Sequence, residues 1–260
     1  MKYTVLTLFP EITDAFFATS IMAKAIKRGI IEYKAVNIRD FAADKHKTCD
    51  DAPYGGGPGM LMLPEPLDLA IKSVLPSENA VKTDENPRII CLSPSGRLFN
   101  QELARELAAE KELILICGRY EGIDQRIIDR YVDDEISVGD YVLSSGEVAA
   151  LAVIDATYRL VDDVIRADSL TEESFSDGLL EYPQFTRPEI FDTIKVPEVL
   201  LSGHHEQIRL WRLEKRVEKT LRQRPDLIQC GKEKGVFNKE INSIIERLVR
   251  EAEGDKNERD

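Results

Sequence analysis

Short apolar runs alternate with longer helical patterns through the first 160 residues, and this alternation limits the possible folds more than any other feature. The predicted strands are 3–9, 33–38, 88–92, 113–117 and 134–138. The predicted helices are 11–28, 64–75, 100–110, 124–131 and 146–158. Gly29 is placed to end the first helix, and Asn100 is placed to cap the third. Strands that alternate with helices predict an α/β fold, with a mostly parallel sheet covered on both faces.

The pattern changes after residue 161. Residues 162–176 are rich in Asp, Ser, Thr and Glu and have few apolar anchors, which is typical of a flexible linker. A strongly helical segment follows at 205–222. The sequence therefore predicts an α/β domain at 1–161, an acidic linker at 162–176 and a small helical domain at 177–260.

Cysteine usage and hydropathy indicate the cellular compartment. The chain has 260 residues and four cysteines, which are far apart and form no C-x-x-C pair. Neither a disulfide framework nor a zinc site is indicated, so we expect a reducing compartment. No uncharged run approaches the roughly 20 residues that span a bilayer, and the start lacks the pattern of a signal peptide. We expect a cytoplasmic protein with no membrane partner.

Charge is unevenly distributed along the chain. The net charge is −12, but residues 121–182 contain sixteen Asp or Glu and four Lys or Arg, so the rest is balanced. Residues 209–224 contain seven Lys or Arg and only two Glu. Because a local basic face can coexist with an acidic total, the charge neither establishes nor excludes a nucleic-acid partner.

Three segments that follow predicted strands are rich in Gly, Ser and Pro: 92–97, 117–122 and 138–147. Ligands of open α/β sheets bind at the carboxyl ends of the strands, and small residues let the backbone approach a ligand closely. One such loop alone would be interpreted as a tight turn, whereas three at successive strand ends predict a pocket. A fourth glycine-rich segment, 50–60, is not a P-loop; it indicates either unusual backbone angles or a flexible surface loop.

Several enzyme classes are disfavoured. No G-x-S-x-G motif is present, and the only histidines are His46, His204 and His205, so serine hydrolysis is not supported. No spaced set of metal ligands is present either. Trp211 falls on a helix with Leu210 and Leu213, and we interpret it as a core residue rather than a base-stacking platform.

Six segments match one known family in order: 50–62, 92–96, 118–124, 138–147, 186–189 and 200–212. The strings Gly-Arg-Tyr-Glu-Gly-Ile-Asp and Gly-Asp-Tyr-Val-Leu-Ser are the most specific. The chain thus resembles the bacterial tRNA (guanine-N1)-methyltransferases of the SPOUT class, from residue 8 to about residue 227. The resemblance implies transfer of a methyl group from S-adenosylmethionine to N1 of guanosine 37, which lies 3′ of the tRNA anticodon.

The resemblance also implies a structure. Residues 1–161 would form the S-adenosylmethionine-binding domain, with a trefoil knot in its C-terminal part, and 177–260 would bind tRNA. The family is homodimeric, with the active site between subunits. Matching positions assign cofactor binding to Leu92, Ser93, Pro94, Gly118, Val138, Gly139, Asp140, Tyr141, Val142, Leu143 and Gly146.

The reaction requires a base, because guanine N1 carries a proton at neutral pH. The family places an aspartate before Ser-Phe in the linker, and the matching residue here is Glu173, with Asp168 and Glu172 as nearby alternatives. Arg159 matches the arginine that stabilises charge on guanine O6, although it could simply complete the dipole of a helix. Glu121 matches a guanine contact, although it could be a turn carboxylate. Mg²⁺ is a further family expectation.

The segment after the linker is expected to bind tRNA through Arg209, Arg212, Lys215 and Arg216, which recur at helical spacing. A solvated charged face is the alternative for each. Ser145 and Ala149 also differ from the family, which has glycine and proline there. Two other functions remain open: a knotted methyltransferase with another RNA target, and an RNA-binding protein that has lost turnover.

Overall fold

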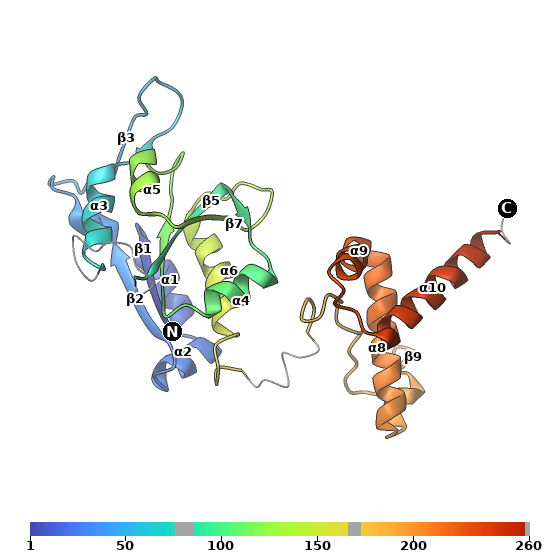
Figure 1. Ribbon diagram of the computed structural model, residues 1–260. Coiled ribbons are helices and arrows are strands. Elements are labelled where there is room, and N and C mark those ends of the chain that lie inside the picture. Colours follow the sequence, from blue (N-terminus) through green and yellow to red (C-terminus); the bar gives the residue numbers. More distant parts are fainter. Residues whose placement is uncertain (76–85, 166–172, 258–260) are drawn as a thin grey trace. The chain divides into compact units, whose positions relative to one another are not determined.

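The chain divides into two compact units, Met1–Ile165 and Arg166–Asp260, in a computed structural model that describes residues 1–75, 86–165 and 173–257 (Figure 1). The division falls within the predicted linker, 162–176, part of which lies outside the described residues. Each unit has its own hydrophobic core.

The first unit is built on one five-stranded sheet. Its strands are β1 (Lys2–Thr7), β2 (Glu32–Asn37), β5 (Arg88–Leu98), β6 (Glu112–Cys117) and β7 (Asp134–Ser137). Their order is β2-β1-β6-β5-β7, and every neighbouring pair is parallel, as the sequence predicted. Strand β5 runs beyond its predicted end. Its pairing with β7 shifts between Leu92 and Arg97, so the predicted loop bulges out from within the strand.

Six helices and a small hairpin complete the described part of this unit. They are α1 (Pro10–Phe17), α2 (Ser20–Lys27), α3 (Pro64–Lys72), α4 (Gln101–Ala108), α5 (Gln125–Tyr131) and α6 (Gly146–Tyr158), with the hairpin of β3 (Asp50–Asp51) and β4 (Leu61–Met62) and the short 3₁₀ helix η1 (Ile38–Phe41). The predicted caps are confirmed. The Asn100 side chain accepts a hydrogen bond from the Leu103 N–H, and Gly29, with a φ of 72°, follows α2.

The prediction of one helix over 11–28 is wrong. Thr19 has an extended backbone, and its hydroxyl donates to the Phe16 carbonyl, so α1 ends before α2 begins. Phe17 and Met22, on either side of this break, pack in the same core cluster. The apolar pattern therefore continues through a change of direction, which is why it resembled a single helix.

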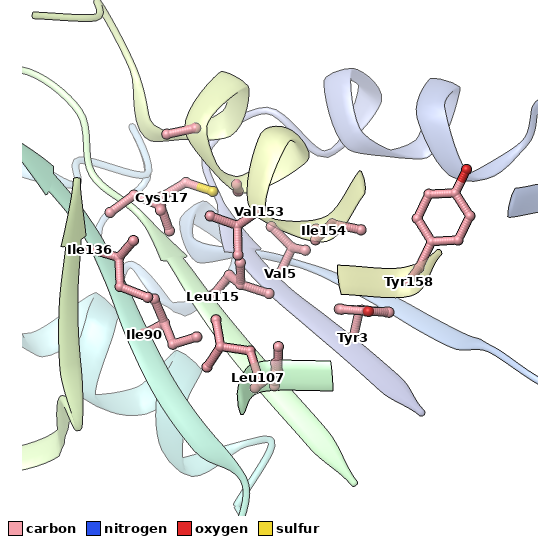
Figure 2. Close-up of a cluster of buried hydrophobic side chains, with 14 of the residues drawn as sticks. Tyr3, Val5, Ile90, Leu107, Leu115, Cys117, Ile136, Val153, Ile154 and Tyr158 are labelled. Carbon is pink, nitrogen blue, oxygen red and sulfur yellow. The ribbon is translucent and has the colours of Figure 1, made fainter. Parts of the chain in front are cut away.

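Side chains alternate between two cores, one on each face of the sheet. In β6, Leu115 belongs to the cluster beneath α6, whereas Ile114 belongs to the cluster beneath α3 and α5. Figure 2 shows Val153 and Ile154 of α6 lying against Leu115 and its neighbours. Both faces of the sheet are therefore covered, whereas the edge strand β2 is partly exposed.

The described part of the second unit is mainly helical. It contains β8 (Ile190–Phe191), β9 (Ile194–Lys195), η2 (Glu198–Leu201), α8 (His205–Gln223), α9 (Pro225–Glu233) and α10 (Lys239–Asn257). Leu179, Val217 and Ile245 are buried at the centre of its core. Among the described residues of either unit, no helix is both long enough and apolar enough to cross a membrane.

Candidate functional site

A cavity of about 330 Å³ lies where β6 and β7 end and where the chain bulges out of β5. Its walls come from the three loops that the sequence singled out, at 92–95, 118–123 and 138–146. The volume falls within the range of roughly 300–1,000 Å³ that is usual for small-molecule sites. The three loops therefore form one pocket rather than three separate turns.

Ten of the eleven residues predicted to bind the cofactor line this cavity. They are Leu92, Ser93, Pro94, Gly118, Val138, Gly139, Tyr141, Val142, Leu143 and Gly146. Asp140 is the exception: its side chain is exposed and does not contribute to the wall. The structure therefore brings ten of the predicted residues together around one cavity.

The floor of the cavity is a close approach between two backbone segments. The Gly146 N–H donates to the Gly118 carbonyl over 2.8 Å, and a Cβ at position 146 would lie 2.7 Å from the Gly118 nitrogen. Glycine is therefore required at position 146. Ser145, by contrast, has a φ of −164°, an extended conformation that any residue adopts. The backbone thus accommodates this departure from the family pattern.

Glu121 lies where the glycine-rich hairpin loop meets the cavity. Its side chain lines the wall, and its N–H donates to the Met60 carbonyl over 3.0 Å. A Cβ at Gly59 would be only 2.3 Å from the Glu121 Cγ, so the loop packs directly against this carboxylate side chain. The glycines of the loop have positive φ angles, which confirms the predicted unusual backbone. The hairpin loop therefore holds Glu121 at one side of the cavity.

The cavity also contains a thiol, which is unsuited to nucleophilic catalysis. Burial raises the pKa of Cys91 to about 12, so its sulfur stays protonated at neutral pH. Burial likewise raises the pKa of Cys117, at the end of β6. Within the described ranges, no group of three or more His, Cys, Asp or Glu side chains could hold a metal ion. The walls instead offer shape, backbone polar groups and carboxylates.

The two predicted catalytic residues are not part of this wall. Arg159 follows α6 as its C-cap, whereas Gly146 begins that helix at the cavity floor. A helix of 13 residues is about 20 Å long at 1.5 Å per residue. Glu173 belongs to the second unit, where its carbonyl accepts from both the N–H and the hydroxyl of Ser176. Asp168 and Glu172, the alternatives for the base, lie outside the described residues.

Acidic partners in the second unit already hold Arg209, Lys215 and Arg216, which were predicted to contact tRNA. Arg209 pairs with Glu206 and Glu240, Lys215 pairs with Glu218, and Arg216 is 6% exposed and pairs with Asp177. Arg212, the fourth predicted cation, contacts the Tyr182 ring, 4.7 Å from its centroid. A phosphate would have to compete with these carboxylates, so the phosphate contacts stay a prediction.

The interpretation of Trp211 as a core residue is wrong. It is half-buried, lies outside the core cluster of its unit and lines a second cavity with Arg212. The helical spacing of Leu210, Trp211 and Leu213 suggested a buried face. However, the 182–201 segment covers that face only in part.

Sequence reasoning also missed some residues of the first cavity. Arg119 and Tyr120 line it beside Gly118, and Glu135 lines it from within β7. The Arg119 guanidinium is held 4.9 Å from the centroid of the Phe9 ring. Adjacency to a predicted ligand residue could have pointed to the first two. Glu135 gives no such signal, because charged residues at the ends of strands are common.

Comparison with known proteins shows the family to which the chain belongs. The family model described as tRNA (Guanine-1)-methyltransferase TrmD matches residues 1–230. A tRNA (guanine-N(1)-)-methyltransferase of Treponema denticola is 61% identical over 251 residues, covering 96% of this chain and all of the relative. A protein of the same name from Treponema pallidum is 57% identical and covers 95% of this chain and 96% of the relative. Another, from Borreliella burgdorferi, is 59% identical and covers 87% of this chain and 92% of the relative. The chain therefore belongs to the tRNA (guanine-1)-methyltransferase family of enzymes.

Proposed function

We propose that the protein transfers a methyl group from S-adenosylmethionine to N1 of guanosine 37, the nucleotide 3′ of the tRNA anticodon. The observation that supports this most directly is the single cavity formed by the three strand-end loops, with Glu121 in its wall. We place the methyl donor in this cavity, held by the ten residues named above, with Asp140 on the outside of the same loop. Bound there, S-adenosylmethionine would supply a methyl group already activated by a positive sulfur.

The fit of the donor rests on features of the cavity itself. Gly118 has no Cβ, and an added one would be 3.7 Å from the nearest side chain, so the missing atom leaves room in the wall. The segments 118–119 and 138–143 present backbone groups that suit the polar edges of a nucleoside. We also propose that this part of the chain contains the trefoil knot of the family.

The chain's own residues would prepare the guanine. In the proposed reaction, the Glu173 carboxylate removes the N1 proton, so that N1 forms the new bond to carbon as the sulfur–carbon bond breaks. Arg159 stabilises the charge that moves to O6, and Glu121 contacts the base. A glutamate has the same carboxylate as the family's aspartate, with one extra methylene of reach. Mg²⁺ as an additional cofactor stays an expectation.

We propose a homodimer in which the pocket of one subunit is completed by Arg159 of its partner. Arg159 and the cavity floor are separated by the full length of α6, so one chain does not bring them together along that helix. Leu98, Val142 and Val148 are each more than half exposed. Exposed apolar residues beside a binding pocket are typical of an interface.

We further propose a role for each part of the chain. Residues 1–161 bind the methyl donor, residues 162–176 link the two domains, and residues 177–260 bind tRNA through Arg209, Arg212, Lys215 and Arg216. We also propose that the enzyme works in the cytoplasm, where it meets its tRNA.

The first test is methyl transfer from labelled S-adenosylmethionine to unmodified tRNA carrying guanosine 37, with adenosine 37 as the control. Label on the first alone, located at N1, is the expected result. Glu173→Gln should lose transfer in a single turnover, whereas Glu173→Asp should retain it. Label elsewhere on the RNA would refute the proposed target, and a fully active Glu173→Gln would refute the proposed base.

Subunit complementation tests the shared site. Arg159→Ala and Val138→Trp, which fills the cavity, should each be inactive alone. Mixed after dissociation, they should recover about a quarter of the wild-type activity, because half of the dimers are mixed and each has one intact site. If pocket and arginine belonged to the same chain, no mixed dimer would contain an intact site. Lack of recovery would therefore refute the shared arrangement.

A further inference from the structure

A second cavity, of about 530 Å³, lies within the C-terminal unit. It shares no lining residue with the cavity at the ends of the sheet. Its walls come from the segment 182–189, from η2 and from the first turns of α8. Three aromatic side chains, Tyr182, Phe185 and Trp211, take part in lining it.

The aromatic rings are accompanied by guanidinium groups. Phe185 and Trp211 have centroids 6.3 Å apart and are tilted by 54°, and Phe185 is 44% exposed. The Arg212 guanidinium carbon lies 4.7 Å from the centroid of the Tyr182 ring, within the range of a cation–π contact, and Arg187 also lines the cavity. Glu189, in the same wall, offers a carboxylate acceptor. Rings, guanidinium planes and one acceptor are what a flat heteroaromatic ring with polar edges requires.

We propose that this cavity binds a nucleobase of the tRNA other than the target guanine. The inference rests on the proposed function, which supplies the RNA. A base that is modified at N1 must leave its stack, and this leaves a neighbouring base of the single-stranded loop without a stacking partner. An aromatic cavity on the RNA-binding unit replaces that partner. Stacking also supplies affinity that does not depend on Arg209, Lys215 and Arg216, whose charges are already paired.

The β8–β9 hairpin of the same unit carries an exposed apolar surface that differs from the cavity in composition. Ile190, Phe191 and Ile194 of the β8–β9 hairpin are each more than half exposed, and they do not line the cavity. These three side chains are apolar, although Asp192, Thr193 and Lys195 of the same hairpin are also exposed. Exposed apolar side chains of this kind suit a protein partner. The cavity instead contains two arginines among its rings, and this composition favours a nucleobase of a polyanion over a second protein chain.

The single tryptophan of the chain reports on the cavity directly. Because Trp211 is the only tryptophan in the sequence, all indole fluorescence comes from the cavity wall. An anticodon stem–loop RNA with guanosine 37 should quench it saturably, with the same Kd as measured by anisotropy of the labelled RNA. Phe185→Ala should raise that Kd roughly 5- to 150-fold, the range for loss of one base–aromatic stack.

Matched variants separate the cavity from its surroundings. Phe191→Ala removes a more exposed aromatic ring, 73% exposed, from outside the cavity and should leave the Kd unchanged. Phe185→Tyr should bind as the wild type does, and Phe185→Ala should bind S-adenosylmethionine normally. A stem–loop with an abasic site at one loop position other than 37 should bind the wild type more weakly. The same abasic site should cost little in Phe185→Ala, and this would identify the bound nucleotide.

The outcomes are distinguishable. If the RNA is bound and methylated but neither quenches Trp211 nor binds Phe185→Ala more weakly, the cavity inference is wrong. If indole fluorescence instead depends on protein concentration without RNA, and Phe185→Ala shifts the sedimentation of the protein, a second copy occupies the cavity and the inference is again wrong. Quenching and the Phe185 effect without methyl transfer would support the cavity while refuting the proposed reaction.

Discussion

Gly146→Ala tests how closely the two backbone segments at the cavity floor approach each other. The added Cβ would lie 2.7 Å from the Gly118 nitrogen, 2.8 Å from the Cys117 Cα and 3.0 Å from the Cys117 carbonyl carbon. All three atoms belong to the backbone, so no side-chain rotation can relieve the contact. Either α6 must begin farther from β6, or the cavity floor must open.

Both responses have an estimable cost. Overpacking of a well-packed site costs about 1–3 kcal/mol, and loss of the hydrogen bond from Gly146 to Gly118 costs about 1 kcal/mol more. We expect the free energy of unfolding in urea to fall by about 2–4 kcal/mol. Because the shift is located in the wall of the proposed donor pocket, the Kd for S-adenosylmethionine, measured by calorimetry, should rise at least about tenfold.

Gly118→Ala is the matched control. A Cβ there would be 3.7 Å from the Ile123 side chain and 3.8 Å from the Leu92 carbonyl oxygen, which are ordinary van der Waals distances. Its unfolding free energy should stay within about 1 kcal/mol of the wild type. Equal losses of unfolding free energy in the two variants would refute the close-approach argument. A Gly146→Ala protein as stable as the wild type would refute it too.

Three further outcomes are expected. Thr7→Val removes the hydroxyl that donates to the fully buried Glu147 over 2.6 Å, and it should lower the unfolding free energy by about 2–3 kcal/mol, measured in urea. Hydrogen bonding from the Arg88 guanidinium lowers the pKa of Glu106 below 4.5. This contribution to stability is complete above pH 4.5 and is lost as the pH falls through the lowered pKa. The melting temperature should therefore fall more steeply with decreasing pH, below pH 4.5, in the wild type than in Arg88→Gln. Alkylation at pH 8 should modify the exposed Cys230 first, and Cys230→Ser should resist over the same period because the remaining thiols are buried.

Local pattern was enough to predict the sheet. The β-branched and apolar runs that form β1 and β6 are short and are bounded by polar segments, so their positions followed from residue type alone. The break between α1 and α2 was not predictable in this way. Thr19 interrupts the backbone without interrupting the apolar face, and only the hydrogen bond to Phe16 shows where the helix ends.

The pocket was predictable because parallel strands bring their carboxyl ends to one edge. Loops that are far apart in the sequence, such as 92–95 and 138–146, are adjacent for that reason alone. The aromatic cavity of the second unit had no comparable rule behind it. Trp211 lies on a helix whose spacing indicates a core, and its exposure depends on how the preceding segment, 182–201, covers it.

The position of Arg159 relative to the cavity gives α6 two functions in the proposed dimer. The same rigid helix contributes Gly146 to the floor of one donor pocket and, one helix length away, presents Arg159. In a two-fold symmetric dimer these two ends would serve different active sites, because each interface contact occurs twice. Binding of the donor at the start of α6 in one subunit would then affect the position of that subunit's Arg159, which contributes to the active site of the other subunit. A dimer whose two sites bind S-adenosylmethionine and react with no dependence on each other would argue against that coupling.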